Sequence, residues 1–179
     1  MGMDRRKIEM MQRALHFFDA TIAAWESLRR EEPEGARGDG TDGSVDSKGL
    51  IRKLAEERLL ERAFLSVSDA AILTIEWLVH RDVGSYEEMA DILELEEAIG
   101  REEGKAMRVL VRGYRALTRD YLKTYEHMGD GSFRSVSEKT PESAEVLESL
   151  FSELSLPALA RLSSLLRQFW LKEGIALEG

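Results

Sequence analysis

The sequence contains no cysteine, and this absence excludes several kinds of site at once. A chain without cysteine has no disulfide scaffold, no thiolate nucleophile and no cysteine-ligated zinc or iron–sulfur centre. The three histidines, His16, His80 and His127, fall on different predicted helices or helix ends, with no acid or second histidine at metal-ligand spacing. We therefore expect no metal ion and no cofactor.

Long hydrophobic runs are also missing. The most apolar stretch, AAILTIEWLV at 70–79, is interrupted by Glu76, and no segment approaches the roughly 18 apolar residues that indicate a membrane span. The N-terminal residues alternate charged and apolar side chains and lack the apolar core of a signal peptide. We expect a cytoplasmic protein that does not enter a membrane.

The sequence has only three prolines, and no segment alternates polar and apolar residues for long enough to predict a strand. Apolar residues instead recur at spacings of three and four, which is typical of amphipathic helices. Segment 31–49 contains five glycines and is expected to be an exposed flexible loop. Helices are expected over 4–30, 49–82, 85–97, 105–128 and about 140–154, with a last one from Pro157.

A chain of 179 residues can bury one hydrophobic core of ordinary size, and it is shorter than chains that commonly divide into several domains. The sequence therefore predicts one helical domain over residues 1–179. Its fold class is all-α, an antiparallel up-and-down bundle of about five or six helices.

Positive charge is concentrated in KAMRVLVRGYRALTRDYLK, residues 105–123, although the whole chain has a formal net charge of −9. On a helix, the six cations of this segment fall within an arc of roughly 80°. They are Lys105, Arg108, Arg112, Arg115, Arg119 and Lys123. A separate face is apolar and aromatic, with Met107, Leu110, Tyr114, Leu117, Tyr121, Tyr125 and Met128.

The cationic row has two interpretations at this point. A row of guanidinium groups can hold a phosphodiester or a nucleotide through bidentate hydrogen bonds. Alternatively, the cations pair with acids of neighbouring helices, within one chain or across a dimer, and such surface pairs contribute little each. The acidic candidates are Glu87, Glu88, Asp91, Glu94, Glu96 and Glu97.

The order of three segments resembles the HepT-like branch of the HEPN superfamily. The segments are LIRKLAEERLLERAFLSVSDAAILTIEWLVHR, SYEEMADILELEEAIGREE and AMRVLVRGYRALTRDYL, and the resemblance spans residues 4–128. It implies a small helical protein of a toxin–antitoxin type system, encoded beside a minimal nucleotidyltransferase. It also implies a homodimer through the motif-bearing helix, with residues 130–179 as a C-terminal helical extension.

The motif of this family is Arg-Asn, two or three mostly apolar residues, then His, one variable residue and Tyr. Without a gap, Tyr114 takes the slot of the Arg and Arg115 that of the Asn. Arg119 then takes the slot of the His, and Tyr121 coincides with the Tyr. A shift of one residue makes Arg115 the motif Arg and places Asp120 in the His slot. Neither alignment retains a histidine.

The resemblance implies a metal-independent endoribonuclease in active members, with the Arg on the scissile phosphate and the His in acid–base or orienting work. Arg119 cannot act as a general base because a guanidinium does not deprotonate in proteins. We therefore expect a chain that does not cleave RNA but binds RNA, a nucleotide or the nucleotidyltransferase through the basic face. The resemblance also implies that Tyr121 is a site of modification with AMP, whereas its position on the apolar face of the helix equally predicts a phenol packed in the core or in an interface.

Two further hypotheses stay open from the sequence. One is a purely structural helical dimer, in which the arginines are paired with acids and no ligand binds. The other is an active ribonuclease with a relocated histidine, and this hypothesis requires His127 to lie near Arg119.

Overall fold

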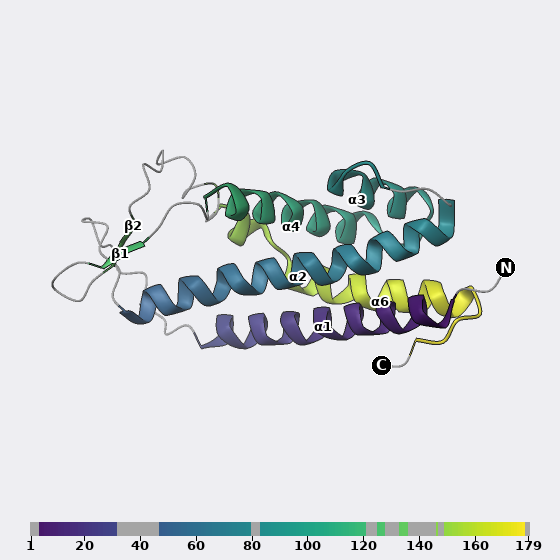
Figure 1. Ribbon diagram of the computed structural model, residues 1–179, viewed down its shortest axis with the longest axis horizontal. Coiled ribbons are helices and arrows are strands. Elements are labelled where there is room, and N and C mark those ends of the chain that lie inside the picture. The colour runs from purple at the N-terminus through teal and green to yellow at the C-terminus, as the bar shows by residue number, and fades with distance from the viewer. Residues whose placement is uncertain are drawn as a thin grey trace.

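The computed structural model describes residues 4–31, 47–79, 83–120, 125–127, 133–135, 146 and 149–177 (Figure 1). Its long helices are α1 (Arg5–Arg30), α2 (Ser47–Val79), α3 (Tyr86–Leu95), α4 (Arg101–Asp120) and α6 (Leu156–Lys172). Residues 149–153 are also helical. Two three-residue strands, β1 (Tyr125–His127) and β2 (Phe133–Ser135), pair in antiparallel fashion. The predicted all-α bundle is confirmed, with this short hairpin as an addition.

α1, α2, α4 and α6 run alternately in opposite directions. α3 runs antiparallel to α4, because Glu87 pairs with Arg115 and Glu94 lies beside Gly104, and it is therefore parallel to α2. Near one end of the α1–α2 pair, Lys7 forms an ion pair with Glu76. Near the other end, Arg52 Nη2 donates to the carbonyl oxygen of Leu28 at 2.8 Å. In Figure 1, α4 lies along the opposite side of α2, and α6 passes behind α2 to contact both α1 and α4. The predicted up-and-down arrangement therefore holds for α1, α2, α4 and α6 but not for α3.

The spacing of apolar residues in the sequence predicts α1. Asp4 caps its start by accepting from the backbone N–H of Arg6 at 3.2 Å, which satisfies one of the free amide groups of the first turn. Six apolar residues of α1 recur at intervals of three and four. The first, Ile8, is partly buried, and the other five are buried: Met11, Leu15, Phe18, Ile22 and Trp25. This stripe faces both α2 and α6, so α1 contributes to the core along most of its length.

A buried tryptophan joins α6 to α2. Trp170 is fully buried, and its Nε1 donates to Oγ1 of Thr74 at 3.1 Å. The ring of Trp77 lies 5.7 Å from that of Trp170, centroid to centroid. Because Thr74 is also fully buried, this hydrogen bond satisfies two polar groups that water cannot reach.

A group of three aromatic rings joins α2 to α3 and α4. The ring of Phe64 stacks on that of Tyr114, with centroids 3.9 Å apart and an interplanar angle of 14°. Tyr86 meets Phe64 edge-on at 4.9 Å. Offset-stacked and edge-on pairs of this kind stabilise a core beyond the area that they bury. The rings therefore fix α3 and α4 on the central helix.

The start of α6 depends on Ser155 and Pro157. Ser155 Oγ accepts from the backbone N–H of Ala158 at 3.3 Å, and Pro157 lies in the first turn, where its missing N–H has no helical partner to lose. We expect Ser155→Ala to lower the free energy of unfolding by about 1 kcal/mol, measured by urea denaturation. Ser164→Ala, at an exposed position inside α6, is the control and should cause no loss. Equal losses in the two variants would contradict the capping role.

Several predicted boundaries are confirmed. α3 begins after Ser85, whose Oγ accepts from the N–H of Glu88 at 3.4 Å, so the predicted capping pair is present. Residues 149–153 belong to the helix predicted over 140–154, while 140–145 lie outside the described residues. Most of the predicted loop, 32–46, also lies outside them, as do 80–82 at the end of the second predicted helix.

Three boundary predictions are wrong. α2 begins at Ser47, so the last three residues of the predicted loop 31–49 are helical. α4 begins at Arg101 rather than 105, which places Gly104 inside the helix, and it ends at Asp120 rather than 128. The helix cannot continue through 125–127 because Tyr125 pairs with Ser135 and His127 with Phe133 in the hairpin. Strands of three residues are too short to leave a period-two pattern in a sequence.

Candidate functional site

α4 separates a cationic face from an apolar one, as predicted. Lys105, Arg112 and Arg115 are exposed, and Arg108 is partly exposed. The opposite face belongs to the core, with Met107, Leu110, Val111 and Leu117 buried. Two predicted site residues, Arg119 and Asp120, are in α4 by their backbone, but their side chains lie outside the described part of the structure. Tyr121 and Lys123 lie outside it altogether.

Arg108 bridges two acids of α3. Its Nη2 and Nε lie 2.6 and 3.2 Å from Oδ1 of Asp91, and its Nη1 lies 2.8 Å from Oε1 of Glu94. The hydrogen bonds that Arg108 donates to Asp91 and Glu94 raise the pKa of its guanidinium above its ordinary value. The guanidinium is therefore fixed in its charged form between two carboxylates, with most of its donors already used.

Gly104 makes this arrangement possible. A Cβ atom at position 104 would lie 1.6 Å from Oε1 and 2.9 Å from Cγ of Glu94, so a side chain there would displace the Glu94 carboxylate. α3 and α4 approach closely at this glycine, and the carboxylate occupies the space where a side chain would be. Close approach of a neighbour is a general reason for glycine inside a helix, and here it explains why a glycine suits position 104 of α4.

The next two arginines of the row are also paired. Arg115 forms an ion pair with Glu87 of α3. Arg112 Nη2 lies 3.1 Å from Oε2 of Glu153, in the helical segment 149–153. Acids thus flank the arginines on both sides, from α3 and from the segment that precedes α6.

The interpretation of α4 as an ion-paired face predicts part of this geometry correctly. Three of the predicted acidic partners, Glu87, Asp91 and Glu94, contact the row. The others do not pair with α4 in the part of the chain that is described. Glu88 instead accepts from the N–H of Gly84 at 3.0 Å. Glu153 was not predicted, because nothing in the sequence indicates that residues 112 and 153 are neighbours.

The family's motif positions have structural contacts where they are described. Tyr114, in the slot of the motif Arg, packs its ring on Phe64. Arg115, in the slot of the Asn or of the Arg, is paired with Glu87. These contacts give both side chains a role in holding α4 against α2 and α3.

No histidine side chain lies on α3 or on the described part of α4. His16 is exposed on α1, where its ring meets that of Phe17 edge-on at 6.2 Å. His127 belongs to β1 and not to α4, and its side chain is outside the described residues. Among the described residues, no three His, Asp or Glu side chains are placed to hold a metal ion. The described surface of α4 therefore offers charged hydrogen-bonding groups but no acid–base pair near neutrality.

Comparisons with known proteins support the fold and no more. No protein-family model matches the chain, and no curated protein matches it significantly. A solved structure, the cytosolic protein of unknown function YutE from Bacillus subtilis, superposes with a TM-score of 0.60. The match covers 95% of this chain and 92% of YutE, at 22% sequence identity. At this identity the likeness shows a shared helical fold over nearly the whole length. Within the described residues, no helix is long and apolar enough to cross a membrane.

Proposed function

We propose that this protein is a HepT-like HEPN protein of a toxin–antitoxin type system that does not cleave RNA and acts by binding a minimal nucleotidyltransferase. The observation that carries the proposal is the pairing of Arg108, Arg112 and Arg115 with four carboxylates. A phosphodiester binds most strongly to uncompensated positive charge. A surface on which positive and negative side chains alternate is better matched to the mixed charges of a protein partner.

The expected lack of ribonuclease activity rests on the chemistry of the motif slots. The described side chains of α3 and α4 include no imidazole, and an arginine in the position of the histidine stays protonated. Tyr121 aligns with the tyrosine that the family's partner modifies with AMP, and it remains the candidate acceptor. The homodimer implied by the resemblance is also part of this proposal, as is a cytoplasmic location.

The proposal predicts no cleavage of a labelled single-stranded RNA by the purified chain, with or without a chelator, in an assay resolved by gel electrophoresis. It also predicts that the chain co-purifies with a co-expressed minimal nucleotidyltransferase encoded beside it. Arg112→Glu combined with Arg115→Glu should weaken this complex at least tenfold. The new carboxylates would repel the acidic groups of the partner that the two arginines attract in the wild-type complex.

The matched control for this pair is Arg5→Glu combined with Arg30→Glu. These arginines form exposed ion pairs on α1, with Glu9 and Glu26, and reversing them changes the net charge equally. Metal-independent cleavage of RNA that disappears in Arg119→Ala would overturn the proposal. So would a complex that both pairs of substitutions weaken equally.

A second candidate function, binding of RNA or a nucleotide without cleavage, is favoured by the exposure of part of the row. The side chains of Arg112 and Arg115 are 56% and 49% exposed, and Lys105 is exposed with no ion pair among the described residues. Tight binding of single-stranded RNA that falls steeply as salt rises would favour this candidate. If neither the nucleotidyltransferase nor RNA binds, the purely structural dimer is the remaining hypothesis.

A further inference from the structure

α2 has an exposed row of residues with the spacing of a coiled-coil seam. The row has seven members: Ile51, Leu54, Arg58, Arg62, Leu65, Asp69 and Ile72. Its six intervals cover the 21 residues from 51 to 72, so they average 3.5 residues, the repeat with which one helix packs along another. The four apolar side chains of the row are between 37% and 66% exposed, although α1, α3, α4 and α6 contact other sides of α2. The row is therefore a helix-packing surface that no described element covers.

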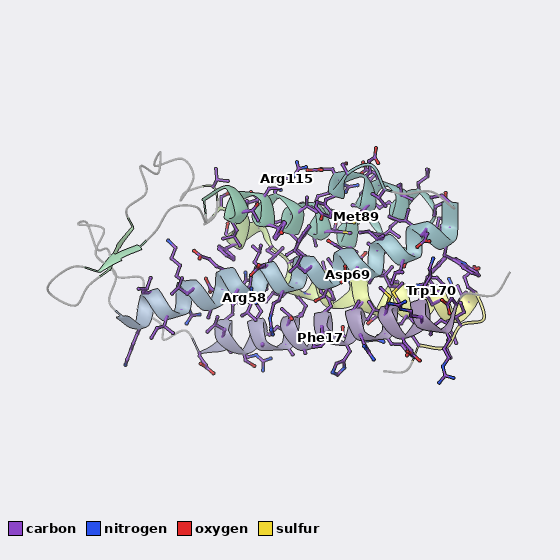
Figure 2. The ribbon with its side chains drawn as sticks, viewed as in Figure 1. Phe17, Arg58, Asp69, Met89, Arg115 and Trp170 are labelled. Carbon is purple, nitrogen blue, oxygen red and sulfur yellow. The ribbon has the colours of Figure 1, made fainter. Side chains whose placement is uncertain are left out.

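A second exposed row lies beside it on α1. The antiparallel register of α1 and α2 places position 10 opposite 72 and position 17 opposite 65. The row of α1 also has intervals of four and three residues: Arg6, Met10, Arg13, Phe17, Ala20 and Ala24. Figure 2 shows Phe17 on α1 and Arg58 and Asp69 on the neighbouring α2. We call the surface formed by these two rows the α1–α2 face.

The unpaired charges of the α1–α2 face are mostly positive. In the described part of the chain, three exposed side chains of the face have no hydrogen bond or ion pair: Arg6, Arg13 and Arg62. Asp69 is the acid of the face, and its carboxylate is also without a partner among the described residues. Arg58 is paired with Glu61. The face thus has an excess of unpaired cations, on a chain whose formal net charge is −9.

We propose that the α1–α2 face binds an amphipathic helix of a partner protein, with an apolar stripe flanked by acidic residues. The spacing of the α2 row indicates a helix, because a repeat of 3.5 residues matches the side chains of a second helix. From position 51 to 72 the row is about 32 Å long at 1.5 Å per residue, the length of a helix of about 21 residues. The unpaired arginines indicate acidic flanks, because carboxylates of the partner would pair with them. Docking of an apolar helical stripe on such a surface is a recurring mode of protein recognition.

The α1–α2 face is separate from the surface used in the proposed function. α4 lies along the opposite side of α2 from α1 (Figure 1). A partner bound to α4, or a homodimer formed through α4, would therefore leave the α1–α2 face exposed. The inference goes beyond the proposed function and has a binding assay of its own.

A designed peptide of about 21 residues tests the inference. It has three heptads with leucine at positions a and d, glutamate at e and g, and alanine elsewhere, so that its carboxylates oppose self-association. The full chain should bind the labelled peptide with a Kd of about 10 μM or below in fluorescence anisotropy, at about 150 mM salt. A scrambled peptide of the same composition should not bind, because its leucines do not form a stripe.

Substitutions in the apolar part of the face should weaken this complex. Phe17→Glu combined with Leu65→Glu should raise the Kd at least about tenfold, because two carboxylates would enter the apolar contact. Both positions are exposed, so the variant should keep its helical circular dichroism. The control is Leu95→Glu combined with Leu171→Glu, at residues of α3 and α6 that are 79% and 63% exposed. Its Kd should stay within about threefold of the wild-type value.

Substitutions of the charged residues test the sign of the partner. Arg13→Glu combined with Arg62→Glu should weaken binding of the acidic peptide at least about tenfold, because like charges would meet. Arg5→Glu combined with Arg30→Glu changes the net charge equally at positions of α1 outside the two rows and should have little effect. Asp69→Asn should tighten binding a few-fold, since it removes the unpaired acid of the face.

Three results would overturn the inference. One is equal binding of the designed and scrambled peptides, or equal losses in the face variants and their controls. Another is a wild-type dimer in sedimentation equilibrium that Phe17→Glu combined with Leu65→Glu dissociates, which would assign the face to a second copy of the chain. The third is binding of phosphatidylglycerol vesicles, and not of the peptide, through the same residues. These measurements do not include the nucleotidyltransferase, so the proposed function is judged separately.

Discussion

Trp170→Ala is expected to lower the free energy of unfolding by about 3–5 kcal/mol, the usual cost of removing a fully buried aromatic side chain. The substitution would leave a cavity between α2 and α6, and it would remove the indole N–H that donates to the buried Thr74 hydroxyl, which itself donates to the carbonyl oxygen of Ala70. For a chain of this size, the loss corresponds to a fall of roughly 6–20 °C in the melting temperature. Thermal and urea denaturation followed by circular dichroism measure both quantities.

The matched control is Leu171→Ala, at the next residue of the same helix. Leu171 is 63% exposed, so its truncation should change the free energy of unfolding by less than about 0.5 kcal/mol. A small loss in Trp170→Ala would contradict the role of Trp170 as the contact that fixes α6. Similar losses of unfolding free energy at positions 170 and 171 would indicate that α6 is rotated about its own axis relative to the orientation described here.

The second large effect is expected when the acids beside α4 are neutralised. We expect Glu87→Gln, Asp91→Asn and Glu94→Gln together to tighten binding of a labelled single-stranded RNA at least about tenfold at low salt. In the wild-type chain, these carboxylates offset the positive charge of the arginines with which they form ion pairs. Removing three negative charges leaves the row free to bind phosphates, and the gained affinity should disappear as salt rises. Fluorescence anisotropy over a range of salt concentrations measures the change.

The control for this experiment removes the same number of charges elsewhere. Glu9→Gln, Glu26→Gln and Glu61→Gln also break ion pairs, but with Arg5, Arg30 and Arg58 rather than with the arginines of α4. We expect little gain in RNA affinity from this set. Equal gains from both sets would show that net charge alone sets the affinity. Tight RNA binding by the wild-type chain would instead show that the acids do not mask the row.

The helices were predictable wherever a local signal sets them. The apolar spacing of α1, the Ser85 cap of α3 and Pro157 at the start of α6 are all properties of a few adjacent residues. The start of α4 was not predictable in this way. Gly104 resembles a helix breaker in the sequence, but it lies inside α4, and Glu94 of α3 fills the space that a side chain would take there.

The candidate site was likewise predictable only where local sequence determines it. Helical geometry predicted the cationic face of α4, and the acid-rich helix before it supplied three of the four acidic partners. The fourth, Glu153, pairs with Arg112 across 41 residues of sequence, and only the fold brings them together. The exposure of some large apolar side chains was missed for a related reason. Exposed Met10 and Phe17 lie beside the buried stripe of α1, and the sequence alone does not show which apolar residues the neighbouring helices leave uncovered.

The placement of the aromatic residues gives this protein two separate optical reporters. All three tryptophans, Trp25, Trp77 and Trp170, are on α1, α2 and α6, whereas Tyr86 and Tyr114 flank Phe64 where α3 and α4 meet α2. Selectively excited indole emission therefore follows loosening around the terminal helices. The near-ultraviolet dichroism of the phenol bands includes Tyr86 and Tyr114 in the other half of the bundle, together with Tyr121 and Tyr125, so a change in these bands that does not coincide with the change in indole emission indicates stepwise melting.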